Sequence, residues 1–220
     1  MEVASDYYTE VSSDLQLAEK NRPMTSTDVN AQLQAHRPKR ADARRNYEKL
    51  IAAGREAFTE DGKSASLEDI ARRAGVGIGT LYRHFPSRQD LLEAVYVEEV
   101  DALCRSAVDL AGEPPWDALV AWLHRFVDYL ATKQALAEEL LAYNDRDAEV
   151  FRSCRTAMYA GGEPLLVRAQ QVRVVRSDTD IAEVIQLVGG IAKIQTAEPE
   201  QRDRLLDLAL DGLRYQGPAA

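Results

Sequence analysis

The chain has 220 residues, of which 45% are hydrophobic and 29% charged, a composition that fits one or two globular domains. No apolar run approaches the roughly 18 residues of a membrane span, so we expect no membrane association. Two cysteines and a polar, acidic N-terminus fit a reduced cytoplasmic protein better than a disulfide-stabilised or exported one.

Positive charge is concentrated in one segment of an acidic chain whose net charge is −9. Residues 37–90 carry 12 Lys and Arg against 8 Asp and Glu, whereas residues 91–220 carry 13 against 22. Residues 1–36 carry 2 against 6 and have few large apolar side chains, so we expect a disordered tail there. Met24 lies within this tail and is an alternative candidate for the start of translation.

The first predicted helix spans about 41–60 and follows a basic stretch, RPKRADARRN. Such a charge run is either solvated surface or an arm that reaches DNA phosphates or the minor groove. The helix places apolar residues at helical spacing, which we expect to point inward. These residues are Tyr47, Leu50, Ile51, Ala57 and Phe58.

Two short helices around a glycine turn are predicted in the segment SLEDIARRAGVGIGTLYRHFPSRQD. Ser66 and Asp69 form a capping-box pattern that begins the first helix. Gly75 stands where a helix end needs a residue that tolerates the left-handed conformation. A second capping box, Ser87 with Asp90, begins a long helix that continues to about residue 110.

The second short helix runs from about Ile78 to Phe85, with Ile78, Leu81 and Phe85 predicted to point inward. We expect Gly77 and Gly79 to let this helix pack against the first one and let its backbone approach DNA. This layout is that of a helix-turn-helix, whose second helix enters the major groove. The alternative is two helices of an ordinary bundle.

The residues from about 44 to 107 resemble the DNA-binding domain of the TetR family of bacterial transcriptional repressors. The stretches that carry the resemblance are AGREAFTEDG, SLEDIARRAGV, GIGTLYRHF and PSRQDLLEAV. The resemblance implies an all-α fold, with a helix-turn-helix DNA-binding domain at 37–90 and a helical bundle for effector binding and dimerisation at 91–220. It implies a transcriptional regulator, by default a repressor that a small-molecule ligand releases from its operator.

By this resemblance, early residues of the second helix read base edges, and its tyrosine and histidine hold phosphates. Ile78 and Thr80 are therefore candidates for base contacts, and helix starts supply free amides for phosphate. In relatives a lysine is common at the position of Arg88, and we expect that exchange to be harmless. The full set of candidate DNA-binding residues is Arg44, Arg45, Ser66, Gly77, Ile78, Gly79, Thr80, Tyr82, His84 and Arg88.

Beyond residue 110 the apolar residues keep helical spacing without period-two alternation, so we expect helices only. One helix is predicted at about 116–132 and a shorter one after it. Gly161, Gly162 and Pro164 are predicted to interrupt the helix that begins near Asp145. The SDTD sequence at 177–180 is predicted to cap a helix that ends near residue 195.

The last two predicted helices have broad apolar faces, which are either plain core or, by the resemblance, a two-fold interface. A homodimer of this kind would read a palindromic operator. Aromatic residues in the middle helices are either core or the wall of an effector cavity that takes an apolar or aromatic compound. The candidates for that wall are Cys104, Trp122, Phe126, Tyr129, Phe151 and Met158.

No enzyme motif is present. The three histidines, His36, His84 and His124, are scattered, and no G-x-S-x-G, P-loop, Rossmann or zinc spacing occurs. We therefore expect no catalytic residue, no cofactor and no metal. The cysteines are expected to be inert buried thiols, with redox sensing as the alternative. Two alternatives to repression remain at this point: an activator of the same fold, and a ligand- or protein-binding helical protein without specific DNA activity.

Overall fold

The computed structural model describes residues 37–140, 146–194 and 199–215. Within these ranges helices are joined by turns and short loops, and the only strand-type pairing is an isolated antiparallel bridge between Val175 and Arg214, which confirms the all-α class. The 3₁₀ turns lie at Gly62–Ser64 and Leu110–Gly112. The α-helices are α3 (Ala41–Asp61), α4 (Leu67–Arg73), α5 (Ile78–His84), α6 (Arg88–Asp109), α7 (Pro115–Leu140), α8 (Arg146–Gln171), α9 (Ile181–Ala192) and α10 (Pro199–Asp211).

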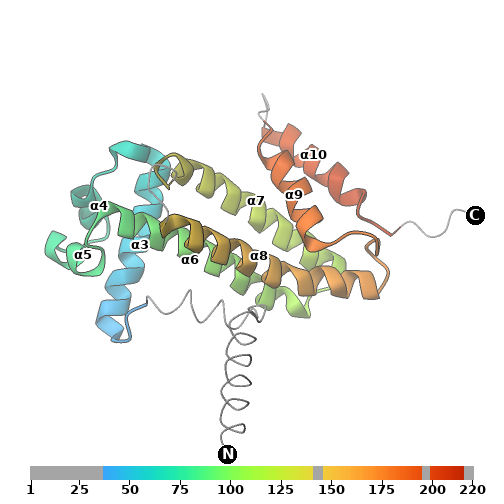
Figure 1. Cartoon of the computed structure of the whole chain (residues 1–220), viewed down its shortest axis with the longest axis horizontal. Helices are drawn as coiled ribbons and strands as arrows, with labels where there is room; N and C mark the ends of the chain where they lie inside the picture. Colours follow the sequence, from blue (N-terminus) through green and yellow to red (C-terminus); the bar gives the residue numbers. More distant parts are fainter. Residues whose placement is uncertain (1–36, 141–145, 195–198, 216–220) are drawn as a thin grey trace, which may run out of the picture.

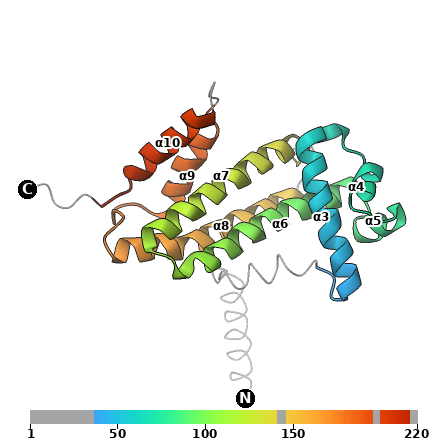
Figure 2. The same cartoon turned by 180° about the vertical axis from the view of Figure 1, so that it is seen from behind.

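The helices build an elongated molecule with two different ends (Figure 1). Helices α4 and α5 lie at one end, α9 and α10 lie at the other, and the view from behind shows the same order (Figure 2). The long helices α6, α7 and α8 pack against one another between these ends, and α3 contacts both α4 and α6. Helix α6 thus runs unbroken from the α5 end into the bundle, and the boundary predicted between residues 90 and 91 lies inside it.

A single cluster of buried apolar side chains runs from α3 to α10. The residues predicted to face inward from α3 are all buried. At the centre of the bundle Trp122 is fully buried, and its indole N–H donates to the carbonyl oxygen of Leu103 at 3.2 Å. A buried indole needs such a partner, so this bond fixes α7 against α6.

Local signals begin several of the helices as predicted. Ser87 and Asp90 form a complete capping box at the start of α6, with the Ser87 N–H donating to Asp90 Oδ2 at 2.8 Å. At Ser66 only half of the predicted box exists, because the hydroxyl accepts from the Asp69 N–H at 3.0 Å but the carboxylate turns away. The Asp69 carboxylate instead accepts from the guanidinium of Arg73 at 2.6 Å, an i,i+4 pair on the helix surface.

The predicted interruption of the helix at residues 161–164 is wrong, since α8 continues through Pro164 to Gln171. Pro164 is exposed and removes one N–H donor from the helix. Gly162 is buried against Trp122, and a Cβ there would lie 2.6 Å from Cζ3 of the indole. The glycine therefore allows a close approach of α8 to α7 rather than ending the helix.

Helix α7 is longer than predicted, because the two helices expected after residue 115 form one continuous helix to Leu140. Contacts with α6, α8 and α9 extend along it, and Leu136 in its last turns is buried. Helix α9 ends at Ala192, three residues earlier than predicted. None of the helices within the described ranges combines the length and the apolar character that crossing a membrane requires.

Candidate nucleic-acid interface and effector cavity

The turn between α4 and α5 is built by local chemistry. Gly75 has φ +66°, a conformation that side chains other than glycine rarely adopt, and the Val76 N–H donates to the Ala71 carbonyl at 3.0 Å. Leu81 and Phe85 of the following segment are buried against α3 and α4. These contacts fix the orientation of α5 and leave its other face in solvent.

Ile78 lies on that outer side, where it is 38% exposed, so the prediction that it points inward is wrong. The interior beneath α5 is already filled by Leu81 and Phe85. An exposed Ile78 at the first position of α5 remains available for a base contact, the other prediction made for it.

The outer face of α5 carries Gly79, Tyr82 and Arg83, which share one side of a helix because they are three and four positions apart. Tyr82 is 45% exposed. A Cβ added at Gly77 or Gly79 would meet no atom within 4 Å, so packing against α4 does not require these glycines, and that prediction is wrong. Their missing side chains leave the α5 backbone open to a partner outside the protein.

Thr80 and His84 are half-buried at the edge of this face. The His84 ring lies 6.2 Å from the Tyr47 ring in an edge-on arrangement. Burial lowers the pKa of His84 from its ordinary value, so near pH 7 the imidazole is neutral. A neutral imidazole reaches a phosphate as a hydrogen-bond donor rather than as a charge.

The arginines at the start of α3 lie in solvent. Arg44 is 3.9 Å from the Glu48 carboxylate, and Arg45 pairs with Asp42. Exposed pairs of this kind are worth less than about 1 kcal/mol, so phosphates can replace the carboxylates at little cost. Arg37, in the basic stretch before α3, is instead held against α6, where it donates to Glu98 at 2.7 Å and to Asp101 at 2.8 Å.

Arg88 has a structural role that the sequence did not reveal. Its guanidinium donates to the carbonyl oxygen of Gly62 at 2.9 Å and to that of Ala65, and it lies 4.8 Å from the centre of the Phe58 ring. The side chain thereby ties the start of α6 to the loop between α3 and α4. For a phosphate contact at this position, the predicted group is the backbone amide at the helix start.

The exchange Arg88→Lys is therefore expected to lower the stability of the protein rather than to be harmless. A lysine ammonium is a point charge that does not reproduce the two-pronged geometry of the guanidinium, and we expect a loss of about 1–2 kcal/mol. Urea unfolding of both proteins at equal concentration measures this difference. Arg83→Lys on the exposed face of α5 is the matched control and should unfold like the wild type. Equal stability of Arg88→Lys and the wild type would contradict the assignment.

A cavity of about 570 Å³ lies between α6, α7, α8 and α9. Three of the six predicted effector-binding residues line it: Phe126, Tyr129 and Met158. Trp122 and Cys104 do not line it, and the side chain of Phe151 lies outside the described residues. The hydroxyls of Tyr129 and Tyr96 are paired at 3.1 Å in its wall.

The sequence analysis missed ten lining residues, and three of them are cations. Lys133 is one turn after Tyr129, and Arg155 lies three positions before Met158, so helical spacing was the available signal. The others are Tyr96, Leu130, Tyr159, Ile185, Gln186, Gly189, Gly190 and Lys193.

Both thiols fit the expectation of inert cysteines. Cys104 donates to the Ala157 carbonyl at 3.5 Å, and Cys154 is buried. Burial raises the pKa of each thiol to about 12, which removes the thiolate on which reactivity depends. Among the residues that the structure describes, no group of three or more His, Cys, Asp and Glu is arranged to hold a metal ion.

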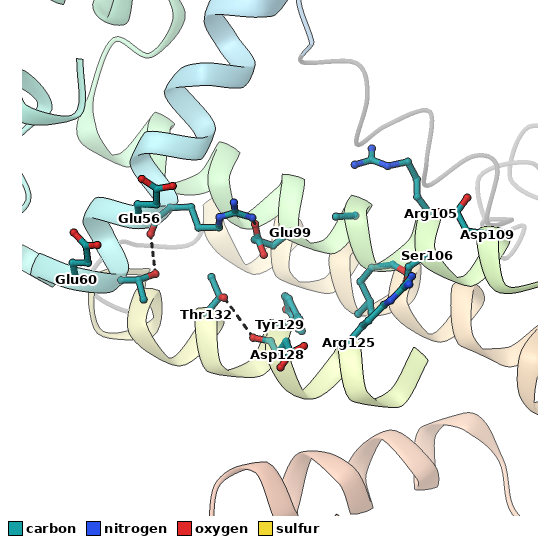
Figure 3. Close-up of a pocket in the computed structure, with 14 residues that line it drawn as sticks. Glu56, Glu60, Glu99, Arg105, Ser106, Asp109, Arg125, Asp128, Tyr129 and Thr132 are labelled. Atoms are coloured by element: carbon teal, nitrogen blue, oxygen red, sulfur yellow. Dashed lines mark hydrogen bonds and ion pairs between the residues drawn. The ribbon is translucent and has the colours of Figure 1, made fainter. Parts of the chain in front are cut away.

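A second hollow, of about 700 Å³, lies between α3, α6 and α7 (Figure 3). Five carboxylates and three arginines line it, and the Arg55 guanidinium contacts the Glu99 carboxylate at 3.2 Å. This lining is that of a solvated, charged groove. An apolar or aromatic effector fits the first cavity better, because aromatic and aliphatic side chains form its walls.

Comparison with known proteins agrees with this architecture. Residues 50–95 match the family described as bacterial regulatory proteins, tetR family, and residues 114–215 match the C-terminal domain of SbtR-like transcriptional regulators. The crystal structure of the TetR transcriptional regulator SCO0520 from Streptomyces coelicolor is 40% identical, with a TM-score of 0.69 over 78% of this chain and 99% of that one. The chain belongs to the TetR family of transcriptional regulators.

Other TetR-family relatives lead to the same conclusion. The TetR transcription regulatory protein of Mycobacterium vanbaalenii is 32% identical, with a TM-score of 0.68 over 80% of this chain and 99% of that one. The HTH-type transcriptional regulator SAR0097 of Staphylococcus aureus is 35% identical over 99 residues, which are 42% of this chain and 51% of that protein. SrpR of Pseudomonas putida is 34% identical over 109 residues, 49% of this chain and 50% of that one. The chain thus spans about half the length of these two curated relatives.

Proposed function

We propose that this protein binds a specific operator as a homodimer and represses transcription until a small molecule releases it. The observation that carries the proposal is the outer face of α5. There, an exposed tyrosine, an exposed isoleucine and two open glycines have no function in the packing of the fold, and exposed arginines lie at the start of α3. Positive charge for phosphates and open backbone for base edges are the two requirements of a reading helix.

Dimerisation through α9 and α10 is the second part of the proposal. These helices bury Val188 and Leu206 in the core, but Leu187 is 44% exposed and Leu208 is 69% exposed. Large exposed apolar side chains on two adjacent helices favour a partner surface. A second copy bound there would place two α5 helices on successive major grooves, about 34–36 Å apart.

The proposed release follows from the continuity of α6. Tyr96 lines the cavity, while Leu91 and Leu92 of the same helix are buried in the core, with Leu91 beside Gly54 of α3. A ligand that displaces Tyr96 therefore moves the helix on which the position of α5 depends. It shifts the equilibrium only to the extent that it binds the released conformation more tightly than the DNA-bound one.

Pull-down of sheared genomic DNA from the host with purified protein, at two salt concentrations, tests the proposal. A palindromic site enriched at both concentrations is the expected result, whereas sequence-blind recovery that disappears at higher salt would show phosphate attraction alone. The double variant Thr80→Ala/Tyr82→Ala should bind the recovered site about a hundredfold more weakly, since each contact is worth 1–3 kcal/mol. Tyr215→Ala, at an exposed tyrosine (41% exposed) of the opposite end, is the matched control and should bind normally.

The pull-down also separates the proposal from its alternatives. Unchanged operator binding by the double variant would remove α5 from the interface. Failure to recover any enriched site would favour a ligand- or protein-binding protein without specific DNA activity. For an activator, the operator would be recovered, but transcription from the neighbouring promoter in a purified system would rise when the protein is added.

A further inference from the structure

The walls and the rim of the cavity between α6, α7, α8 and α9 differ in chemistry. Phe126, Tyr129, Met158 and Ile185 form apolar walls. The two tyrosine hydroxyls in the wall are paired with each other, and burial raises the pKa of Tyr96 to about 12, so the wall carries no negative charge near neutral pH. The body of a ligand held here is therefore apolar or aromatic.

Three cations surround this apolar space: Lys133 of α7, Arg155 of α8 and Lys193, which directly follows α9. No Asp or Glu is among the described lining residues, and none of the three cations forms an ion pair with a carboxylate in the described part of the chain. This is unusual in a region, residues 91–220, that carries 22 acidic against 13 basic residues. The described lining thus has a shared positive potential, which attracts an anion.

Lys133 is the most buried of the three cations. Its Nζ lies 5.9 Å from the centre of the Tyr96 ring, and it is half-buried, whereas Arg155 and Lys193 reach solvent. Burial, together with the charges of Lys193 and Arg155, lowers the pKa of Lys133. A bound anion would raise the pKa of Lys133 again, because an opposite charge nearby stabilises the protonated amine.

We propose that the effector of this protein is an organic anion: an aromatic or aliphatic body that fills the cavity, with one carboxylate, sulfonate or phosphate group held by Lys133, Arg155 and Lys193. This inference rests on the proposed function, because it names the chemical class of the releasing ligand. The volume of about 570 Å³ lies within the range that holds drug-sized molecules. The anionic group faces the open side of the cavity and remains partly hydrated.

A matched pair of fluorescent probes tests the charge requirement without DNA. The anionic probe is 8-anilinonaphthalene-1-sulfonate, and the neutral one is N-phenyl-1-naphthylamine, the same ring system without the sulfonate. We expect the anionic probe to bind the wild type at least about tenfold more tightly, the equivalent of one charge-assisted contact. Lys133→Met should remove about that factor for the anionic probe and leave the neutral probe unchanged.

Controls keep the test specific to the cavity. Lys193→Met, at an exposed position, should lower the affinity for the anionic probe by a smaller factor. This variant replaces Lys133→Met in the test if Lys133→Met does not fold. Lys49→Met, on the exposed side of α3, removes the same charge far from the cavity and should change nothing. Equal affinity of the wild type for the two probes, or an equal loss in all three variants, would overturn the inference.

The probe experiment and the operator experiment can fail separately, so the failure of one proposal is distinguishable from the failure of the other. Operator binding by the wild type together with no preference for the anionic probe would overturn the effector class and leave the regulator intact. A preference for the anionic probe without any operator would support the anion site and remove its interpretation as an effector site. The release of operator DNA by the anionic probe, and not by the neutral one, is the result expected when both hold.

Discussion

Gly162→Ala is expected to destabilise the protein by about 2 kcal/mol, although alanine favours a helix over glycine by almost 1 kcal/mol. Its Cβ would lie 2.6 Å from Cζ3 of Trp122 and closer still to Cη2. The indole is fully buried, and its hydrogen bond to Leu103 prevents it from moving away freely. Helix α8 would therefore have to separate from α7 along a well-packed interface. Urea unfolding at equal protein concentration measures the loss.

The neighbouring glycine gives a control with the opposite sign. A Cβ at Gly161 would meet Cys104 at 3.5 Å, an ordinary contact. We expect Gly161→Ala to stabilise the protein by about 0.5–1 kcal/mol through helix propensity alone. Adding Trp122→Phe to Gly162→Ala removes the clashing atoms, so the double variant should be less destabilised than the sum of the single ones. Additive effects, or a stable Gly162→Ala, would show that the close approach of α8 to α7 is not required.

The elements predicted correctly from the sequence are those whose signals lie within a few residues. The Ser87–Asp90 box, the left-handed Gly75 and the inward face of α3 each depend on neighbours in the chain. Such local chemistry operates in the same way in any protein. It was therefore sufficient to locate the helix-turn-helix and the long helix that follows it.

The errors concern residues whose partners are distant in the sequence. From its neighbours in the sequence, Gly162 is predicted to interrupt a helix. The reason for a glycine there is Trp122, 40 positions earlier in the chain, which packs against Gly162 within a continuous helix. The structural role of Arg88 was missed, because nothing nearby in the sequence predicts the carbonyl groups of Gly62 and Ala65 as its partners. Ile78 fits the inward spacing, but Leu81 and Phe85 fill the space.

The cavity between α6, α7, α8 and α9 illustrates the same limit. Aromatic residues in the middle helices indicated a cavity or a core, and spacing alone does not separate the two. Trp122 belongs to the core and Phe126, one turn later, to the cavity wall. The cations on the rim come from α7, from α8 and from the residue that follows α9, so no single segment of the sequence displays them together.

Gly79→Glu is expected to abolish operator binding while the fold stays intact or gains stability. Glutamate favours a helix over glycine, and a carboxylate in the first turn interacts well with the helix dipole, so unfolding should require about 0.5–1 kcal/mol more free energy. A Cβ at this position meets no atom within 4 Å in the protein. Against DNA, the same side chain would bring a negative charge toward the phosphates at the centre of the reading face, and we expect the operator affinity to fall about a thousandfold.

Gly79→Gln separates the size of the new side chain from its charge. Glutamine has nearly the same shape, so any steric conflict with the base edges is common to both variants. The additional loss in Gly79→Glu is then electrostatic, and it should shrink as salt is raised, because ions screen the repulsion from the phosphates. Operator titrations by fluorescence anisotropy at two salt concentrations measure the steric and the electrostatic loss of affinity. Circular dichroism confirms that each variant is folded. Wild-type affinity in a folded Gly79→Glu protein would exclude the outer face of α5 as the reading surface. A strong loss in both variants that does not depend on salt would leave α5 in the groove, with steric exclusion rather than charge as the cause.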